Sequence, residues 1–208
     1  IIGTWVRFDL SQYSWKTGSS QMLRNKNMRW ASNLFHVGIL GLIFGHLIGM
    51  LTPSFIYEIF ITPGQKQIMA IVIGGIAGVL CWIGLAMLLW RRFTDDRISH
   101  TSSFSDKFIL ILLFIQLNLG MISIYFSMGH LDGSTMVKLA GWAQDITIFR
   151  PLQALAKLDG VHVVYQLHMA MGITLIMIFP FTRLIHVISA PVWYLGRRYQ
   201  IVRLKKSQ

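Results

Sequence analysis

The chain has 208 residues, of which 54% are hydrophobic and 13% are charged, and its 19 Lys and Arg against 8 Asp and Glu give a formal net charge of +11. Soluble domains carry roughly 25% charged residues, so this composition excludes an ordinary soluble enzyme domain, and its apolar content excludes a disordered chain. The single cysteine, Cys81, allows no internal disulfide, no iron–sulfur cluster held by this chain and no covalently attached c-type haem.

The predicted elements begin with a short apolar stretch, Ile1 to Val6, which we interpret as the end of a first helix whose start is missing. Four later stretches have the length of about 20 apolar residues that a helix needs to cross a hydrocarbon core of about 30 Å. They are Leu34 to Met50, Ile68 to Trp90, Phe108 to Phe126 and Val161 to Ile185. Gly133 to Ile148 is predicted to form a short amphipathic helix on the outer surface. The predicted fold class is an all-α integral membrane protein, a transmembrane helical bundle of four full spans plus the end of a truncated first helix.

We expect one domain over residues 1–208, in which 1–33 hold the end of the first helix and a cytoplasmic segment, 34–190 the four spans, and 191–208 a basic cytoplasmic tail. The positive charge is distributed unevenly between the connections. Fifteen Lys and Arg fall in the segment after the first helix, the loop after the second apolar stretch and the tail, whereas four fall in the other connections. The positive-inside rule therefore predicts a multi-pass protein with a cytoplasmic C-terminus, and the basic charge does not require nucleic acid as a partner.

Four of the seven histidines lie inside predicted spans, where a titratable side chain is costly and therefore suggests a function. His36 and His46 lie in the first full span, and His168 and His186 lie in the last. These two spans run in opposite directions, so residues at equal depth have a nearly constant sum of residue numbers. By this rule His36 pairs with His186 near the cytoplasmic face, and His46 pairs with His168 near the outer face.

Two opposed imidazoles at one depth are the axial ligands that a six-coordinate b-type haem iron needs, so the two pairs predict two stacked haems. At about 1.5 Å per residue, the two histidines lie about 15 Å apart along the first full span and about 27 Å apart along the last. The eighteen-residue spacing returns to the same helix face, so His168 and His186 are predicted to point at one neighbour, with a kink at Pro180 between them. His36 and His46 lie about 80° apart around their helix, so this helix must be tilted or rotated for both histidines to bind haem.

Simpler explanations compete with haem binding. Histidines inside membranes also hydrogen bond between helices, although this explains four depth-matched histidines less well than it explains one. Gly41, Gly45 and Gly49 follow one another at four-residue spacing, which fits either the approach of a flat macrocycle or plain helix packing. A zinc or di-iron site is disfavoured, because the spans place no carboxylate beside the histidines.

Several stretches of the sequence closely resemble the gamma subunit, a cytochrome b, of respiratory membrane-bound nitrate reductase. They are SQMLRNKNMRWASNLFHVGILGLIFGHLIGMLTP (Ser20–Pro53), DGSTMVKLAGWAQ (Asp132–Gln144), QLHMAMGITLIMIFPFTRLIHVISAP (Gln166–Pro191) and RRYQIVR near the tail. The resemblance covers nearly the whole chain and implies five helices with two non-covalent b-type haems in the bacterial inner membrane. It implies the quinol-oxidising subunit of a quinol:nitrate oxidoreductase complex, with an iron–sulfur beta subunit and a molybdenum alpha subunit as cytoplasmic partners.

The resemblance also implies roles for single residues. The family's axial ligands match the four span histidines in the pairing given above, and its quinol site beside the outer haem matches Gly45, His46 and Lys66. Without the resemblance, Lys66 is equally well explained as an interfacial lysine that snorkels from a helix end.

Arginines near the cytoplasmic face are candidate partners for the haem propionates. These candidates are Arg91, Arg92 and Arg183, although an arginine that only sets topology is the simpler explanation for each. The basic stretch from Arg197 to Lys206 is the predicted contact surface for the partner subunits.

The expected function is quinol oxidation near the outer face, with protons released outside and electrons passed inward through both haems to the partner that reduces nitrate to nitrite. One alternative is a di-haem b anchor of another respiratory oxidoreductase, of the formate dehydrogenase or hydrogenase type. A second alternative is a haem-free transporter in which the four histidines form a proton relay. The loops are too short for a soluble catalytic domain, so nitrate reduction is expected on a partner.

Overall fold

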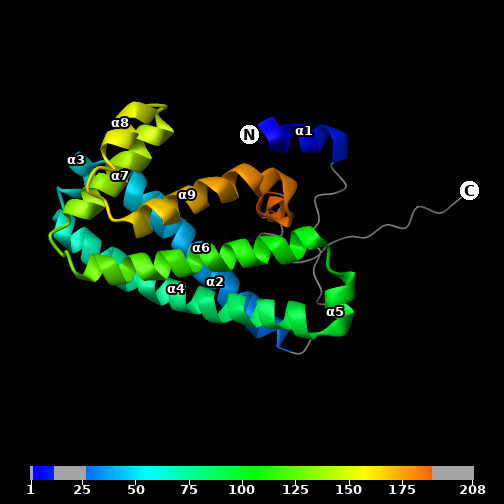
Figure 1. Ribbon diagram of the computed structural model, residues 1–208. Coiled ribbons are helices and arrows are strands. Elements are labelled where there is room, and N and C mark those ends of the chain that lie inside the picture. The colour runs from blue at the N-terminus through cyan, green and yellow to red at the C-terminus, as the bar shows by residue number, and fades with distance from the viewer. Residues whose placement is uncertain (1, 12–26, 189–208) are drawn as a thin grey trace, which may run out of the picture. The chain divides into compact units, whose positions relative to one another are not determined.

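The computed structural model describes residues 2–11 and 27–188. Within these residues every regular element is a helix. The chain divides into two units, one made of residues 19–178 and the other of residues 1–18 and 179–208 (Figure 1).

Four helices in the described part of the chain are long and apolar enough to cross a membrane. They are α2 (Met28–Leu51), α4 (Pro63–Thr94), α6 (Phe104–Met128) and α9 (Val163–Ile178), with the last candidate span reaching Phe181. The four predicted spans are therefore confirmed. The helices α2, α4 and α6 extend beyond the apolar stretches because they include polar end turns. For example, capping boxes begin α4 at Thr62 and Gln65 and α6 at Ser103 and Asp106.

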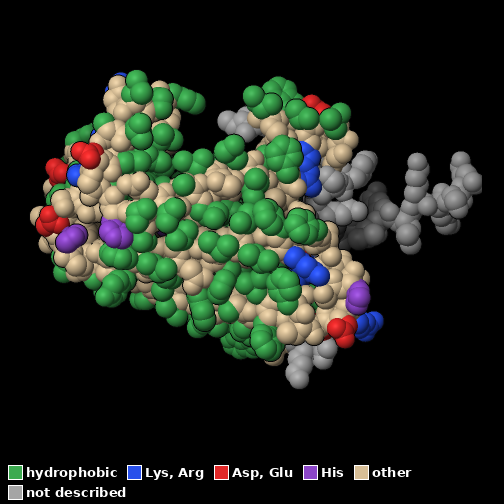
Figure 2. Space-filling model, viewed as in Figure 1, with side chains coloured by type: hydrophobic (Ala, Val, Ile, Leu, Met, Phe, Trp, Pro, Cys, Tyr) green, Lys and Arg blue, Asp and Glu red, His purple; other side chains and the backbone are tan. Residues whose placement is uncertain are grey.

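In the larger unit, α4 packs between α2 and α6, and α9 packs against α6. Each of these helices is antiparallel to the one before it, which is the arrangement expected when successive spans are joined by short connections. Many large hydrophobic side chains on the spans are exposed, including Val37, Phe44, Ile76 and Ile176. Figure 2 shows hydrophobic side chains along the helices and charged side chains collected towards their ends. This distribution suits a surface covered by lipid.

Two glycines allow α2 and α4 to pack backbone against backbone. A Cβ atom at Gly38 would lie 2.6 Å from the carbonyl oxygen of Ala77, and one at Gly84 would lie 2.8 Å from that of Ala31. Lipid tails are as apolar as leucine, so close van der Waals contact through small residues is what holds membrane helices together. These two contacts fix the register of α2 against α4.

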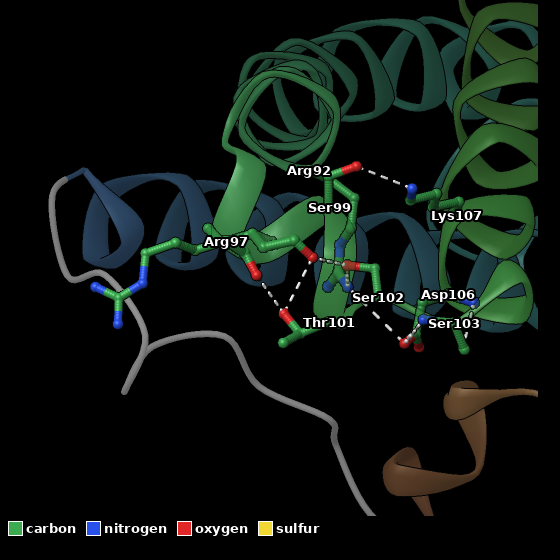
Figure 3. A network of polar contacts seen from close by, with 9 residues as sticks. Arg92, Arg97, Ser99, Thr101, Ser102, Ser103, Asp106 and Lys107 are labelled. Atoms are coloured by element: carbon green, nitrogen blue, oxygen red, sulfur yellow. Dashed lines mark hydrogen bonds and ion pairs between the residues drawn. The ribbon is translucent and has the colours of Figure 1, made fainter.

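Polar contacts join the C-terminal end of α4 to its neighbours. At the end that we call the Arg92 end, Arg92 donates to Ser102 Oγ at 2.7 Å and lies 3.8 Å from the Asp106 carboxylate (Figure 3). Lys107 Nζ donates to Ser99 Oγ at 3.0 Å, which ties the start of α6 to α5 (Asp96–Thr101), while Arg92 ties it to the end of α4.

At the opposite end, which we call the α7 end, three short helices cover the spans. They are α3 (Ser54–Tyr57), α7 (Ser134–Thr147) and α8 (Pro151–Ala156). The helix predicted over Gly133 to Ile148 is therefore confirmed as α7. Gln144 donates to the carbonyl oxygens of Met50 at 3.0 Å and Thr52 at 3.4 Å, so α7 satisfies acceptors that the end of α2 leaves without helical partners.

The smaller unit brings together the two predicted end segments. It contains α1 (Ile2–Ser11), the 3-10 helix η2 (Phe179–Phe181) and the 3-10 helix η3 (Arg183–Val187). Arg7 donates to the carbonyl oxygens of Pro180 and Thr182, the latter at 3.0 Å. The helix at the start of the chain therefore runs past Val6 to Ser11.

The prediction of one kinked helix up to Ile185 is wrong. The α-helix ends at Ile178 and the chain continues in 3-10 turns. Pro180 has no N–H to donate to the carbonyl four residues earlier, and its ring clashes with that carbonyl, so here it ends the α-helix. His186 lies on η3, so the argument that it shares a helix face with His168 does not hold. Residues 12–26 and the basic tail at 191–208 lie outside the described residues.

The glycine contacts predict a sharp difference between two alanine substitutions. Gly38→Ala should destabilise the chain by about 1–3 kcal/mol, because the new methyl group pushes α2 away from the α4 backbone. Gly75→Ala on α4 meets nothing within 4 Å and should be neutral or slightly stabilising, because alanine is the better helix former. Thermal unfolding of both variants in detergent tests this, and equal melting temperatures would contradict the packing argument.

Candidate functional site

The structure brings together two of the four predicted haem ligands. His46 on α2 and His168 on α9 face each other with ring centroids 6.1 Å apart and an interplanar angle of 45°. They are 122 positions apart in the sequence and come from the first and last long helices of the larger unit. The level pairing predicted for these two residues is therefore present in the fold.

The separation of the two rings suits a metal ion held between them. A bond between a metal ion and an imidazole is about 2.0–2.1 Å long, so two imidazoles on opposite sides of one ion place their bonding nitrogens about 4 Å apart and their ring centres about 6 Å apart. His46 and His168 have this spacing, and two histidines are the donor set that a six-coordinate haem iron uses. The residues present thus fit a b-type haem.

All four predicted haem ligands share one hydrogen-bonding feature. In each of them Nδ1 contacts a backbone carbonyl oxygen. The acceptors are Ser32 for His36 (2.7 Å), Leu42 for His46 (2.7 Å), Gln116 for His168 (3.2 Å) and Arg183 for His186 (2.6 Å). A carbonyl oxygen can only accept, so Nδ1 carries the hydrogen and the neutral ring has its lone pair on Nε2. Metal-binding histidines are oriented in this way, because the second ring nitrogen donates to a carbonyl or carboxylate.

The other histidines do not show this feature. His162 is exposed and has the opposite pattern, because its Nδ1 accepts from the backbone N–H of Val164 at 3.3 Å. Its ring stacks on Phe126 with centroids 4.1 Å apart. His100 and His130 are exposed. Hydrogen bonding therefore separates the four predicted ligands from the remaining histidines.

Two residues on α6 hold the His168 ring, and sequence reasoning missed both. A Cβ atom at Gly120 would lie 2.9 Å from His168 Cε1, so the ring occupies space that only glycine leaves open. Gln116 supplies the carbonyl acceptor for the ring, and its own Oε1 is buried without a hydrogen-bond partner among the described residues. An amide inside an apolar span was the available signal, because such a group is costly unless it has a role.

His36 and His186 lie in different units, and each has its own local support. His36 Nδ1 also lies 3.2 Å from Ser32 Oγ, and its ring meets the edge of Phe35 at a centroid distance of 5.2 Å. His186 is half-buried on η3. The pairing of these two histidines stays a prediction.

The glycine stripe on α2 leaves a surface open beside His46. A Cβ atom at Gly41 would lie 3.3 Å from the Ala77 side chain, but at Gly45 and Gly49 nothing in the described residues lies within 4 Å. The close packing of α2 and α4 occurs at Gly38 instead. Among the described residues, Gly45 and Gly49 therefore pack against no neighbouring helix, and the backbone beside His46 is open.

Lys66 lies in the first turn of α4 and is buried, with 8% of its surface exposed. Its Nζ lies 3.6 Å from the centroid of the Tyr57 ring and has no hydrogen-bond partner among the described residues. An interfacial lysine that snorkels would extend its ammonium group into water, so snorkelling does not describe this side chain. The α2–α4 register places Lys66 level with Leu51, about 7.5 Å along the helix axis from His46.

The three arginines predicted to bind propionates have different surroundings. Arg92 is buried and contacts Ser102 and Asp106, as described above. Arg91 is half-buried on the same turn of α4. Arg183 begins η3 and provides the carbonyl that accepts from His186. The contacts of Arg92 explain it as a tie between α4 and α6.

Comparison with known proteins places the chain in a family. The family described as nitrate reductase gamma subunit matches residues 1–205. The chain is 52% identical to the respiratory nitrate reductase 2 gamma chain of Escherichia coli and 50% identical to the respiratory nitrate reductase 1 gamma chain of that organism, over 99% of this chain and 91% of each relative. It is 33% identical to the nitrate reductase gamma chain of Bacillus subtilis, over 98% of this chain and 91% of that relative. The chain, with its helical bundle and facing histidines, therefore belongs to the nitrate reductase gamma subunit family.

Proposed function

We propose that the chain oxidises quinol at its α7 end and passes the electrons through two b-type haems to the other subunits of a respiratory nitrate reductase. The observation that carries this proposal is the facing pair of His46 and His168, with both Nδ1 atoms held by backbone carbonyls. His36 and His186 are the proposed second ligand pair, on the cytoplasmic side. Haem bound by these residues supplies one-electron redox chemistry.

The quinol site in this proposal is formed by Lys66, Gly45 and His46. Lys66 donates a hydrogen bond from Nζ to a quinol oxygen, for which its buried and hydrogen-bond-unpaired ammonium group is suited. The open surface at Gly45 admits a flat ring beside His46. The donor is a two-electron, two-proton carrier, and both protons leave at the α7 end.

This arrangement separates charge across the membrane. In the proposed orientation the α7 end faces outward, the Arg92 end and the C-terminus face the cytoplasm, and the membrane is the bacterial inner membrane. Moving one charge across costs about 2.3 kcal/mol per 100 mV, so electron flow must be driven by the downhill reaction with nitrate. The partners are an iron–sulfur beta subunit and a molybdenum alpha subunit on the cytoplasmic side, with Arg91 and Arg183 as candidate propionate partners.

The family match favours nitrate reductase over the formate dehydrogenase and hydrogenase alternatives. The hydrogen bonds also argue against the proton-relay alternative. A relay histidine exchanges protons at both ring nitrogens, but each of these four rings has Nδ1 committed to a backbone carbonyl, and in His36 and His46 that carbonyl belongs to the same helix.

Removing one ligand from each pair should remove a different haem. We expect the intact complex to contain two b-type haems, and His36→Ala and His46→Ala each to lose one of them while keeping the other. Reduced-minus-oxidised spectra with haem-to-protein stoichiometry provide the measurement, and the exposed His130→Ala serves as the control that keeps both. A wild-type complex without haem would support the proton relay, and loss of the same haem from both variants would refute the pairing.

Gly120→Ala tests the packing around His168 without removing a ligand. The added methyl group would lie 2.9 Å from the imidazole, so the ring must move and the haem held with His46 should be lost or spectrally altered. The second haem should persist. Gly75→Ala on α4 is the matched control, and an unchanged spectrum in both variants would show that His168 does not depend on Gly120.

Lys66→Ala tests the quinol site. Loss of a hydrogen bond from a charged donor costs about 1.5–3 kcal/mol, so the KM for a short-chain naphthoquinol should rise about 10- to 100-fold while both haems stay in place. Steady-state oxidation of menadiol by the intact complex with nitrate as acceptor provides the measurement. Lys138→Ala on the exposed face of α7 is the control, and an unchanged KM in Lys66→Ala would exclude Lys66 from the site.

A further inference from the structure

Tyr57 and Lys66 are held together by the short connection between α2 and α4. The Tyr57 carbonyl accepts from the N–H groups of Phe60 at 3.0 Å and Ile61 at 2.9 Å, which fixes the turn that follows α3. Five residues further on, the capping box of Thr62 and Gln65 fixes the start of α4. Both ends of this connection are therefore ordered by their own hydrogen bonds.

The first turn of α4 is also held from the side of α6. Gln67, next to Lys66, donates to the carbonyl oxygens of Ser127 at 2.9 Å and of His130. A Cβ atom at Gly64 would lie 2.9 Å from the carbonyl oxygen of Leu131, so the chain after α6 packs directly on this turn. The backbone that carries Lys66 cannot shift without breaking these contacts.

The Tyr57 ring is the contact that the structure gives Lys66 Nζ among the described residues, while the nearby Glu58 carboxylate acts on Lys66 through its charge and not through a hydrogen bond. Tyr57 is 9% exposed and Lys66 is 8% exposed, so the contact of 3.6 Å is shielded from water. A cation over an aromatic face is attracted by the ring quadrupole, and this attraction is strongest when the pair is desolvated. The ring accepts no conventional hydrogen bond from Nζ, so it holds the charge while the N–H groups stay available.

The state of the Tyr57 hydroxyl group fits this role. Burial, followed by the charge of the adjacent Glu58 and a hydrogen bond to its side chain, raises the pKa of Tyr57. The hydroxyl group therefore stays protonated at physiological pH. A tyrosinate beside Lys66 would form an ion pair and compete with a ligand oxygen, whereas a neutral ring does not.

We propose that Tyr57 is the positioning residue of the quinol site: its ring holds the Lys66 ammonium group in place with its N–H donors unsatisfied, so that the quinol oxygen is their first acceptor. This inference rests on the proposed quinol-oxidising function and adds a residue that does not itself contact the quinol. It requires the aromatic face of residue 57 and not its hydroxyl group.

The test compares substitutions at Tyr57 in the intact complex. Tyr57→Leu removes the aromatic face. Two constants should then rise about tenfold, which corresponds to about 1.4 kcal/mol. They are the KM for menadiol and the dissociation constant of heptyl-hydroxyquinoline N-oxide, a fluorescent quinone analogue. The value of kcat at saturating menadiol should change less than KM. Tyr57→Phe keeps the face and should restore both constants to within about threefold of the wild type.

A double-variant comparison ties the effect to Lys66. In the Lys66→Ala background, Tyr57→Leu should raise KM and the dissociation constant no further, because the ring then has no ammonium group to hold. Tyr125→Leu is the matched control, since that tyrosine lies on α6, is 70% exposed and contacts the ring of Phe126. It should leave both constants unchanged.

Different failures point to different errors. If Lys66→Ala binds the analogue as tightly as the wild type, the proposed quinol site is wrong. If Lys66→Ala weakens binding but Tyr57→Leu does not, or if Tyr57→Phe is as impaired as Tyr57→Leu, the positioning role is refuted while the site stands. Haem content verifies assembly, and Tyr57→Met replaces Tyr57→Leu if the latter does not assemble. If neither variant assembles, Tyr57 serves the fold and the inference is rejected.

Discussion

An imidazole inside a membrane span must place its N–H against an acceptor, and water is not at hand to provide one. In α2 the acceptor is the carbonyl four residues earlier in the same helix, at Ser32 for His36 and at Leu42 for His46. This bond determines which ring nitrogen carries the lone pair and directs it away from the helix that bears it. His168 finds its acceptor across the bundle, on Gln116 of α6, so its orientation depends on the packing of two helices. The facing arrangement of His46 and His168 therefore depends on one hydrogen bond within α2 and one between α9 and α6.

Small residues determine whether such an arrangement can form. Gly38 and Gly84 bring α2 against α4, and Gly120 admits the His168 ring into the surface of α6. In lipid these contacts hold the bundle together by complementary shape, because apolar side chains gain little from leaving one apolar environment for another. The glycines at 45 and 49 have the opposite use, since they leave the α2 backbone accessible next to His46. The same residue type therefore closes one face of α2 and opens another.

The sequence was sufficient to predict the four spans, the helix at residues 134–147 and the opposition of His46 and His168, because hydropathy, span direction and residue depth are properties of the chain itself. It was not sufficient for contacts that depend on which helix faces meet. Gly38 and Gly84 do not differ in sequence from the glycines that face open space, and Gly120 gains its importance only from the ring beside it. Pro180 was interpreted as a kink, but whether proline bends or ends a helix depends on whether neighbours satisfy the carbonyls that it frees. Tyr57 was missed because it lies outside the spans, where an aromatic residue resembles an ordinary interface residue.

The facing histidines come from the first and last long helices of the larger unit, α2 and α9, so they are synthesised far apart in time. Chains are made and inserted from the N-terminus onward, so α2, α4 and their connection can be in place before α9 has left the ribosome. The Tyr57–Lys66 contact can form at that early stage, since its members are nine positions apart in the sequence. The contact of His46 with His168 has to wait for the last long helix. Any group that needs both imidazoles can therefore be retained only by a fully inserted chain, and its capture reports that membrane insertion has finished.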